Sequence, residues 1–402
     1  MRILMVSHGY PPTLSGVTLV VQKLARAMVR RGHHVTVVTS SDAGETYEAE
    51  DEGVRLIRVH GGLNPFWKEA PIPFISHGDL QDIVEDVQPD ILHAHESGPL
   101  GLQLARLETE PDVPRVISCY YVPRFAARYL AWNGEPSEIV ESIVRSYSIW
   151  LFNHFRCVVF STAAHRQFFA GDELVVPTTV ISNGVDVRRY SPAGGCDEGV
   201  EAKYDLPAGP RILFVSRLAK DKEIDVLLSS MRSLDPALGA QLLLVGRGDD
   251  EPRLQEITDE LDLRDRVRFL GFVPEEDLPA LYRASSLFAI ASICEVQSLP
   301  TLQAAATGLP VVAADAVALP ELVHHGVNGF LVPPGKPEAF ALAMEELLRD
   351  QALAARMGTA SRAIAQEHAE DRTFDQYEEL WLQTAREHDN PRQPSVITPR
   401  AH

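Results

Sequence analysis

The sequence predicts an α/β protein of two doubly wound, Rossmann-like domains, each a parallel sheet with helices on both faces. Two observations predict this class. Short apolar segments rich in β-branched residues alternate with segments of helical periodicity through both halves of the chain. The length of 402 residues exceeds what one core supports and suits two domains of about 150–200 residues each.

The first half of the chain, residues 1–185, is the predicted N-terminal domain. Its clearest predicted helices, 17–32 and 75–88, carry apolar residues at helical spacing. We expect its ligand at the carboxyl ends of the strands, as in other doubly wound sheets. The predicted strands are short apolar runs with β-branched residues, and they span 2–7, 34–40, 54–60, 90–95, 115–121, 156–162 and 178–183.

Residues 186–210 interrupt this pattern with glycine, proline and charge, and we interpret them as the linker between the domains. The alternation resumes over 211–370, the predicted C-terminal domain, and the two sheets should face a common cleft. Residues 371–388 form a predicted helix that returns to the N-terminal domain, and the polar tail 390–402 should be frayed. The predicted strands here are 211–217, 240–248, 266–272, 286–292, 310–315 and 329–334, with helices at 223–234, 251–262 and 300–308.

Composition and charge argue against several functions. The formal net charge of −19 opposes binding to nucleic acid and disfavours peripheral contact with an anionic membrane. The first residues lack the features of a signal peptide, and no apolar stretch is long enough to span a membrane. The oligomeric state stays open. The cysteines are too far apart for a zinc site or a disulfide framework, which fits reduced thiols in the cytoplasm: Cys119, Cys157, Cys196 and Cys294.

Two turns have the residues to bind an anion. Ser15 and Gly16 begin a predicted helix after a Pro-Pro turn, where glycine allows close approach and the helix N-terminus attracts negative charge. Arg217 and Lys222 follow a strand five residues apart, and two cations there suit a diphosphate. The structural alternatives are a simple helix cap at Ser15 and a solvated basic loop around the two cations.

Glycine turns in the second domain give weaker indications. Gly246 lies in a Gly-x-Gly turn between a strand and a helix, which indicates a phosphate or a nucleotide. Gly271 follows the next strand, and a helix is predicted to begin near Pro274. Backbone groups of that loop, around Val273, could contact a nucleobase, although both turns also fit plain topology.

The segment around Glu295 carries the strongest indication. Glu295 lies in a loop before a predicted helix that has Pro300 in its first turn. We expect the backbone amides of 297–299 to point into the cleft at the positive end of that helix. Glu295 and Gln303 could then contact opposite ends of one extended ligand.

The order of these motifs, with NGVD at 183–186 and the segment 308–335, resembles the large family of retaining GT-B glycosyltransferases. That family includes sucrose-phosphate synthases and bacterial phosphatidylinositol mannosyltransferases. The resemblance runs from Arg2 to about Ala385. It implies a GT-B fold and transfer of a sugar from a nucleotide donor with retention of configuration. It also implies that no obligatory metal and no cofactor are needed, since the nucleotide sugar is a substrate.

The resemblance also implies roles for the candidate residues. Fixed cations and a helix N-terminus would stabilise the charge that develops on the β-phosphate of the leaving group. The leaving phosphate could take the acceptor proton, so no dedicated base is expected. The catalytic residues would be Arg217, Lys222 and Glu295. The nucleotide would be held by Gly16, Ser216, Gly246, Gly271, Val273, Ser298, Leu299 and Gln303, and the donor sugar or acceptor would meet His8, Ser15, His95, Tyr120, Val296 and Gln297.

Two residues depart from the family pattern. Gln303 stands where the family usually has a glutamate that binds the ribose hydroxyls. Since charge-assisted hydrogen bonds are stronger than neutral ones, the amide should weaken nucleotide binding by about tenfold or somewhat more without abolishing it. Tyr120 falls where a histidine usually faces the donor sugar near its C6 hydroxyl. Either the donor is unusual there, or His8 or His95 serves instead.

Several functions stay open from the sequence. The acidity of the chain favours a small soluble acceptor, such as a natural-product or thiol precursor. The segment 124–155 is aromatic and partly amphipathic and resembles the acceptor side of members that glycosylate lipids, although a core helix would look the same. A non-catalytic nucleotide-binding GT-B protein is a further alternative. An epimerase or a phosphorylase on a related fold lacks a clear case in the residues.

Overall fold

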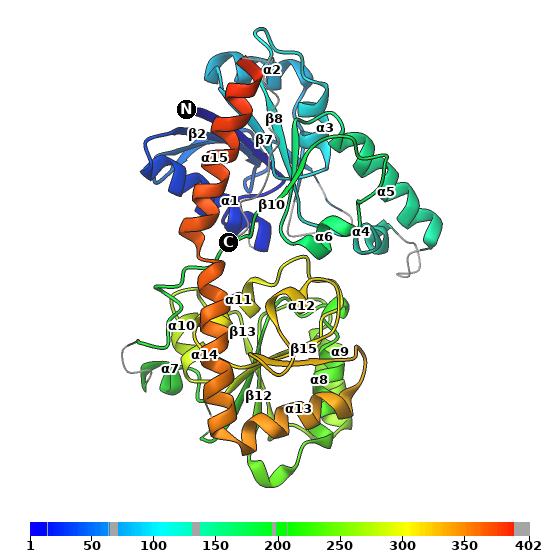
Figure 1. Cartoon of the computed structure of the whole chain (residues 1–402), viewed down its shortest axis with the longest axis vertical. Coiled ribbons are helices and arrows are strands. Elements are labelled where there is room, and N and C mark those ends of the chain that lie inside the picture. Colours follow the sequence, from blue (N-terminus) through cyan, green and yellow to red (C-terminus); the bar gives the residue numbers. More distant parts are fainter. Residues whose placement is uncertain are drawn as a thin grey trace. The chain divides into compact units, whose positions relative to one another are not determined.

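A computed structural model of the chain describes residues 1–13, 15–62, 64, 71–130, 137–194, 198–206 and 208–389 (Figure 1). The tail 390–402, expected to be frayed, lies outside the described residues, as does Cys196. The chain divides into two units. Unit 1 contains Met1–Ser182 and the segment from Thr373 onward, and unit 2 contains Asn183–Arg372.

Unit 1 has, within its described residues, an eight-stranded sheet in the order β10-β9-β8-β7-β1-β2-β4-β3. All neighbouring strands are parallel except β3, which runs antiparallel to β4 at the edge. The sequence analysis did not predict β3, because its residues YEAED are mostly polar and form no apolar run. The strands are β1 Arg2–Ser7, β2 His34–Ser40, β3 Tyr47–Asp51, β4 Val54–Val59, β7 Ile91–Ala94, β8 Arg115–Cys119, β9 Cys157–Phe160 and β10 Thr178–Val180, and a separate small pair is β5 Gly61–Gly62 and β6 Ile72–Pro73.

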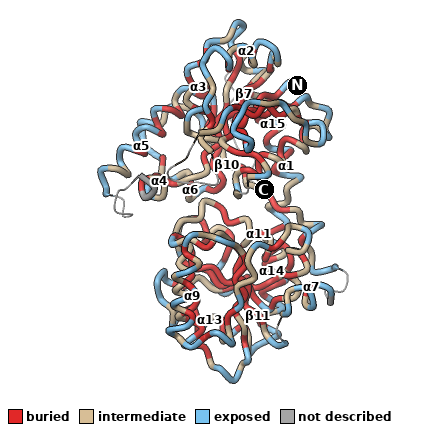
Figure 2. The backbone as a smooth tube through the Cα atoms, turned by 180° about the vertical axis from the view of Figure 1, so that it is seen from behind, coloured by how far each residue is buried: buried red, intermediate tan, exposed pale blue. Residues whose placement is uncertain are grey.

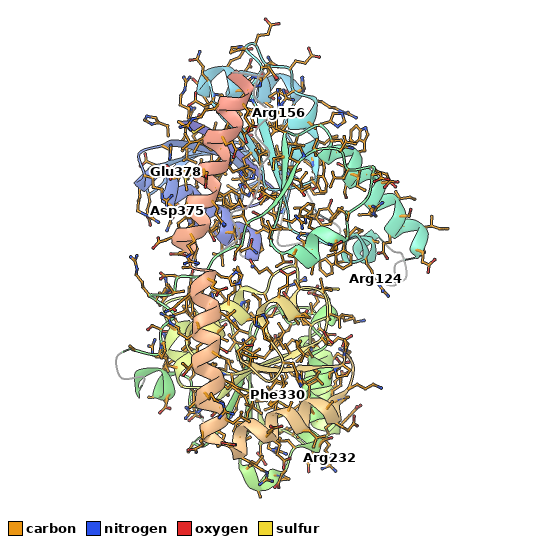
Figure 3. All side chains as sticks on the ribbon, in the orientation of Figure 1. Arg124, Arg156, Arg232, Phe330, Asp375 and Glu378 are labelled. Atoms are coloured by element: carbon orange, nitrogen blue, oxygen red, sulfur yellow. The ribbon has the colours of Figure 1, made fainter. Side chains whose placement is uncertain are left out.

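Helices cover both faces of the unit 1 sheet. One hydrophobic cluster combines the sheet with α1 and with the C-terminal helix α15, and the other combines it with α2, α3 and α5. Ion pairs reinforce the first face. Asp375 and Glu378 lie on α15 (Figure 3), and each carboxylate lies 2.6 Å from the Arg31 guanidinium. The helices are α1 Gly16–Arg30, α2 His77–Val87, α3 Pro99–Arg106, α4 Pro123–Leu130, α5 Glu138–Phe152, α6 Ala163–Gln167 and α15 Glu370–Asp389.

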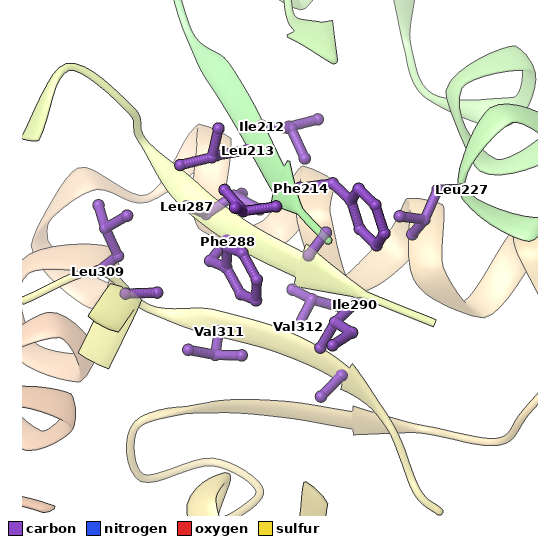
Figure 4. Packing of buried hydrophobic residues seen from close by; sticks show 14 of the residues in the cluster. Ile212, Leu213, Phe214, Leu227, Leu287, Phe288, Ile290, Leu309, Val311 and Val312 are labelled. Carbon is purple, nitrogen blue, oxygen red and sulfur yellow. The ribbon is translucent and has the colours of Figure 1, made fainter. Parts of the chain in front are cut away.

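Unit 2 has a six-stranded sheet among the described residues, in the order β13-β12-β11-β14-β15-β16, and all its pairs are parallel. Figure 4 shows the side chains of β11, β14 and β15 packing in its core. The strands are β11 Arg211–Val215, β12 Gln241–Val245, β13 Val267–Gly271, β14 Leu287–Ile290, β15 Val311–Ala314 and β16 Gly329–Val332. The helices are α7 Glu198–Lys203, α8 Ile224–Ser233, α9 Glu251–Glu260, α10 Leu278–Arg283, α11 Leu299–Ala306, α12 Leu319–Leu322, α13 Pro337–Arg349 and α14 Gln351–Glu367, with short 3₁₀ turns η1 Lys220–Lys222 and η2 Pro236–Leu238.

The prediction of two doubly wound α/β domains is confirmed, since each unit has its own parallel sheet and its own core. In both units the buried residues follow the strands, and the outer faces of the helices are exposed (Figure 2). This pattern is the one that sheets covered on both faces require.

Two elements differ from the sequence analysis. The expected linker, 186–210, lies within unit 2, because Tyr190 is buried in its core and Arg362 donates to the Tyr190 carbonyl at 2.7 Å. The helix expected to begin near Pro274 begins instead at Leu278. A turn precedes it, in which the Asp277 N–H donates to the Pro274 carbonyl at 3.0 Å.

Candidate functional site

The loops after β11, β12, β13 and β14 lie at one edge of the unit 2 sheet. The strands are parallel and in register, with Val215 of β11 opposite Val245 of β12 and with β14 on the other side of β11. The residues that follow these strands therefore gather at the carboxyl edge, where a doubly wound sheet binds its ligand.

Lys222 and Glu295 lie at the centre of this edge. Lys222 ends η1, and its Nζ lies 2.7 Å from Oε1 of Glu295, in the loop after β14. The same ammonium lies 3.3 Å from Oδ2 of Asp221, and Nη2 of Arg217 lies 3.6 Å from Oδ1 of Asp221. The Lys222, Glu295 and Asp221 side chains are largely buried, whereas 38% of the Arg217 side chain is exposed. We call these four residues the charged cluster.

The charged cluster keeps its lysine protonated. Burial by itself lowers the pKa of Lys222, but the carboxylates of Glu295 and Asp221 outweigh this effect and raise the pKa above its usual value. A fixed ammonium beside a more exposed guanidinium is an arrangement suited to a diphosphate. The sequence analysis missed Asp221. An acid between two candidate phosphate-binding cations was the signal that could have identified it.

The backbone of Asp221 joins the two loops that carry the cluster. Its carbonyl oxygen accepts a hydrogen bond from the Ile293 N–H at 3.4 Å and from the Ser292 hydroxyl at 3.3 Å. These bonds hold η1 against the loop after β14. The positions of Lys222 and Glu295 therefore depend on each other through the backbone as well as through their ion pair.

Glycine allows the neighbouring loops to touch backbone to backbone. Gly246 has a φ of 129°, and a Cβ there would lie 1.9 Å from the Ser216 carbonyl oxygen, so no other residue fits. The Gly246 N–H donates to the Gly271 carbonyl at 2.8 Å. The structure thus brings together the predicted residues Ser216, Gly246 and Gly271. Val273, in the loop after β13, is buried. Their contact with a nucleotide stays a prediction.

Helix α11 begins beside Glu295. Ser298 is its N-cap, and the Ser298 hydroxyl accepts from the Thr301 N–H at 3.3 Å. Because the first N–H groups of a helix lack partners within the helix, the N-terminal turn at Leu299 suits an anion. The Gln297 side chain, by contrast, is buried and accepts from the Asn183 N–H at 2.6 Å. That side chain therefore binds the protein's own backbone, and Val296 beside it is half-buried.

Gln303 contacts a buried tyrosine. It lies one turn into α11 and is half-buried. The hydroxyl of Tyr282 lies 3.0 Å from Gln303 Oε1 and 3.2 Å from the Pro300 carbonyl oxygen. Tyr282 comes from α10 and is fully buried. The sequence analysis missed this contact, because α10 and α11 are brought together only by the tertiary fold.

In unit 1, the Ser15 side chain is a helix cap. Its hydroxyl accepts from the Thr18 N–H at 3.1 Å, and the Thr18 hydroxyl accepts from the Ser15 N–H at 2.9 Å. The two bonds form a capping box at the start of α1, which is the structural alternative considered from the sequence. Gly16 is the first residue of α1 and is exposed. Its contact with a diphosphate stays a prediction.

His8, His95 and Tyr120 follow the adjacent strands β1, β7 and β8, so they share the carboxyl edge of the unit 1 sheet. The hydroxyl of Tyr120 lies 2.9 Å from Nδ1 of His95. Burial lowers the pKa of His95 to about 3 and that of His8 to about 4, so both imidazoles are neutral near pH 7. The Tyr120 hydroxyl is thus committed to a neighbouring side chain, and any contact of these residues with substrate stays a prediction.

Glu96 is a titratable residue of this edge that the sequence analysis missed. It follows His95, and its Oε1 accepts from the N–H groups of Leu100 and Gly101 in α3 at 2.7 and 3.2 Å. Burial raises the pKa of Glu96 to about 7, and the two N–H groups only partly oppose this. Its carboxyl group is therefore half protonated near neutral pH.

We expect the Glu96→Gln variant to gain stability over the wild type as the pH rises. Between the usual pKa of 4.5 and about 7, the unfolded chain releases the proton that the folded chain keeps, so rising pH destabilises the wild type across this window. Glutamine can still accept from both N–H groups. Denaturant unfolding should show a relative gain of about 1–3 kcal/mol between pH 4 and 8. Identical pH dependence of the two proteins would show that the Glu96 pKa is not raised.

Two family models match the chain. The model described as Glycosyltransferase Family 4 matches residues 14–189, and the model described as Glycosyl transferases group 1 matches residues 202–364. The D-inositol 3-phosphate glycosyltransferase of Streptomyces griseus is 32% identical over 389 residues, which cover 87% of this chain and 80% of that protein.

Solved structures share the fold. Sucrose-phosphate synthase from Thermosynechococcus elongatus superposes with a TM-score of 0.79 at 22% identity, covering 95% of this chain and 98% of that chain. HepE of Anabaena in complex with UDP-glucose superposes with a TM-score of 0.77 at 22% identity, covering 95% of this chain and 100% of that chain.

The fold and the family matches define a glycosyltransferase with the GT-B fold that uses a nucleotide sugar. The chain belongs to glycosyltransferase family 4, and its C-terminal half matches the group 1 glycosyl transferases.

Proposed function

We propose that the chain transfers a sugar from a UDP- or GDP-sugar to a small soluble acceptor, with retention of configuration. The charged cluster is the observation that carries this proposal. It combines two cations for a diphosphate with a carboxylate beside the N-terminus of α11. These are the parts that the departure of a nucleoside diphosphate needs, because negative charge grows on its β-phosphate as the glycosidic bond breaks.

In this proposal each group has a distinct role. Arg217 and Lys222 bind the diphosphate, and the first turn of α11 adds the positive end of a helix. Glu295 accepts hydrogen bonds from the donor sugar. Unit 1 binds the acceptor through the edge that contains His8 and His95. The leaving phosphate takes the acceptor proton, so no dedicated base is needed. The proposed reaction uses neither a metal ion nor a cofactor. We place the protein in the cytoplasm as part of the same proposal.

The similarity to the Streptomyces griseus protein supports a small polar acceptor, because that relative is named for D-inositol 3-phosphate. HepE supports a UDP-sugar as one donor, since its structure contains UDP-glucose. A natural-product or thiol precursor also fits an acidic protein better than an anionic membrane does. The acceptor atom in these compounds is oxygen, nitrogen or sulfur.

A lipid acceptor is the second candidate, and one observation favours it. Helix α5 exposes apolar side chains three or four residues apart, which places them on one face. They are Ile139, Ile143, Tyr147 and Trp150. Among the described residues, no helix is long and apolar enough to cross a membrane.

Release of the nucleoside diphosphate tests the proposal. The intact protein is incubated with UDP- and GDP-sugars, alone and with D-inositol 3-phosphate, a small thiol, or vesicles containing phosphatidylinositol. We expect one donor to release its nucleotide faster when a soluble acceptor is present. Faster release of the nucleoside diphosphate only with vesicles would contradict a soluble acceptor and support a lipid acceptor. Nucleotide binding without release under any condition would indicate a non-catalytic protein.

A further inference from the structure

The hydroxyl of Tyr282 lies between two carbonyl oxygens. Pro300 O lies 3.2 Å away and Oε1 of Gln303 lies 3.0 Å away. A phenol has one hydrogen to donate, so it can donate fully to only one of them, and the second oxygen would face it without a hydrogen. Burial raises the pKa of Tyr282, which keeps the hydroxyl protonated. In this arrangement, one of the two carbonyl oxygens lacks a good hydrogen bond from the hydroxyl.

A half-turn of the Gln303 amide resolves this conflict. The oxygen and nitrogen of an amide are distinguished by their hydrogen-bond partners. After the half-turn, Nε2 of Gln303 donates to the Tyr282 oxygen, and the Tyr282 hydroxyl donates to the Pro300 carbonyl. Every group in this chain of two bonds then has a complementary partner. The amide oxygen of Gln303 then points away from Tyr282. Because the residue is only half-buried, part of it remains accessible.

A carboxylate cannot form the same chain. It has no hydrogen to donate, so the Tyr282 hydroxyl would donate to it and leave the Pro300 carbonyl without that bond. A carboxylate also presents an acceptor oxygen at either end and needs no orientation. The amide of a glutamine presents its oxygen to the ligand only if a hydrogen bond holds its nitrogen on the opposite side. The combination of Gln303 with Tyr282 therefore does what a glutamate would do alone.

We propose that Tyr282 is a positioning residue for nucleotide recognition, which binds the amide nitrogen of Gln303 and so directs the amide oxygen toward a ribose hydroxyl of the donor. This inference rests on the proposed function and on the ribose contact that the family resemblance implies for Gln303. It adds a specificity determinant on α10, a helix to which the sequence analysis gave no role.

Tyr190 provides a matched control. Its ring packs edge to face on that of Tyr282, with the centroids 5.8 Å apart, and it is equally buried. Its hydroxyl makes no hydrogen bond to any residue that the structure describes. Tyr190→Phe and Tyr282→Phe therefore remove the same atom from the same aromatic pair, and only the second removes a contact with Gln303.

The test compares the affinities of ribonucleoside and 2′,3′-dideoxynucleoside diphosphates, measured by calorimetry with the base that the wild type prefers. We expect the wild type to prefer the ribo form, and Tyr282→Phe to reduce this preference by about two- to tenfold, the usual effect of one neutral hydrogen bond. Affinity for the dideoxy form should not change. Tyr190→Phe should keep the full preference. Equal preference in Tyr282→Phe and the wild type would overturn the inference, as would an equal loss of affinity for both ligands.

Gln303→Glu separates positioning from a merely structural role. Alone, it should keep or tighten the binding of the ribo form. In its presence, Tyr282→Phe should no longer reduce the ribo preference, because a carboxylate needs no orientation. An equal effect of Tyr282→Phe in both backgrounds would contradict the inference. If the wild type binds ribo and dideoxy nucleoside diphosphates equally well, Gln303 does not bind the ribose hydroxyls. That result would also overturn the inference. A wild type that binds no nucleoside diphosphate would contradict the proposed function itself.

Discussion

Lys222→Ala and Arg217→Ala are each expected to lower kcat/KM. The loss of transition-state stabilisation calculated from kcat/KM should be at least about 2–3 kcal/mol, the usual scale for one preorganised electrostatic group. In the proposed function, both side chains supply positive charge to the departing diphosphate. The Asp221 carbonyl oxygen accepts hydrogen bonds from Ile293 N–H and the Ser292 hydroxyl. These bonds fix the turn that carries Lys222, so the ammonium is placed before the donor binds. Steady-state kinetics with the preferred donor measure the effect.

Lys220→Ala is the matched control for these two variants. Lys220 belongs to the same 3₁₀ turn as Lys222, but its side chain is exposed. We expect its kcat/KM to stay close to that of the wild type. Unfolding curves for all three variants show whether a loss of activity arises at the site or from a destabilised fold. Turnover near the wild-type level in both Lys222→Ala and Arg217→Ala would show that the charged cluster does not bind the diphosphate.

Glu295→Gln is expected to lower turnover without weakening the binding of the free nucleoside diphosphate. A hydrogen bond to a charged group contributes about 1.5–3 kcal/mol. Replacing the carboxylate that we propose holds the donor sugar should therefore lower kcat/KM by at least about tenfold. The free nucleoside diphosphate, however, should bind as tightly as before or more tightly. Its phosphates no longer compete with the Glu295 carboxylate for Lys222.

Glu338→Gln controls for the loss of one negative charge. Glu338 lies in the first turn of α13, within the same unit, and is exposed. It should leave both kcat/KM and nucleotide affinity unchanged. Parallel losses of turnover and of nucleoside diphosphate binding in Glu295→Gln would show that Glu295 supports the structure of the site instead of binding the sugar.

The fold could be predicted because its strands have a strong local signal. The strands β1, β11 and β14 contain the continuous apolar runs ILMV, ILFV and LFAI, which are typical of buried parallel strands. The antiparallel edge strand β3 has no such signal, since its polar residues alternate between half-buried and exposed positions. The beginning of α10 also escaped prediction, because a turn at Pro274 uses residues that would equally suit a first helical turn.

The candidate site was only partly predictable, for a different physical reason. Arg217, Lys222 and Glu295 were found from their residue types and their places after strands, and the structure brings Lys222 and Glu295 into contact. Asp221 and Tyr282 make contacts between separate elements, which local patterns do not encode. Ser15 and Gln297 show the converse, because both side chains bind the protein's own backbone.

The most direct test of the central claim is a calorimetric comparison of a nucleoside diphosphate with the matching monophosphate. The difference in affinity measures what the β-phosphate gains at the charged cluster. We predict that the intact wild type binds the diphosphate at least about tenfold more tightly, as one charge-assisted hydrogen bond would provide. Lys222→Ala should lose most of this preference. Equal affinity for the two nucleotides in the wild type, or an undiminished preference in Lys222→Ala, would contradict the account.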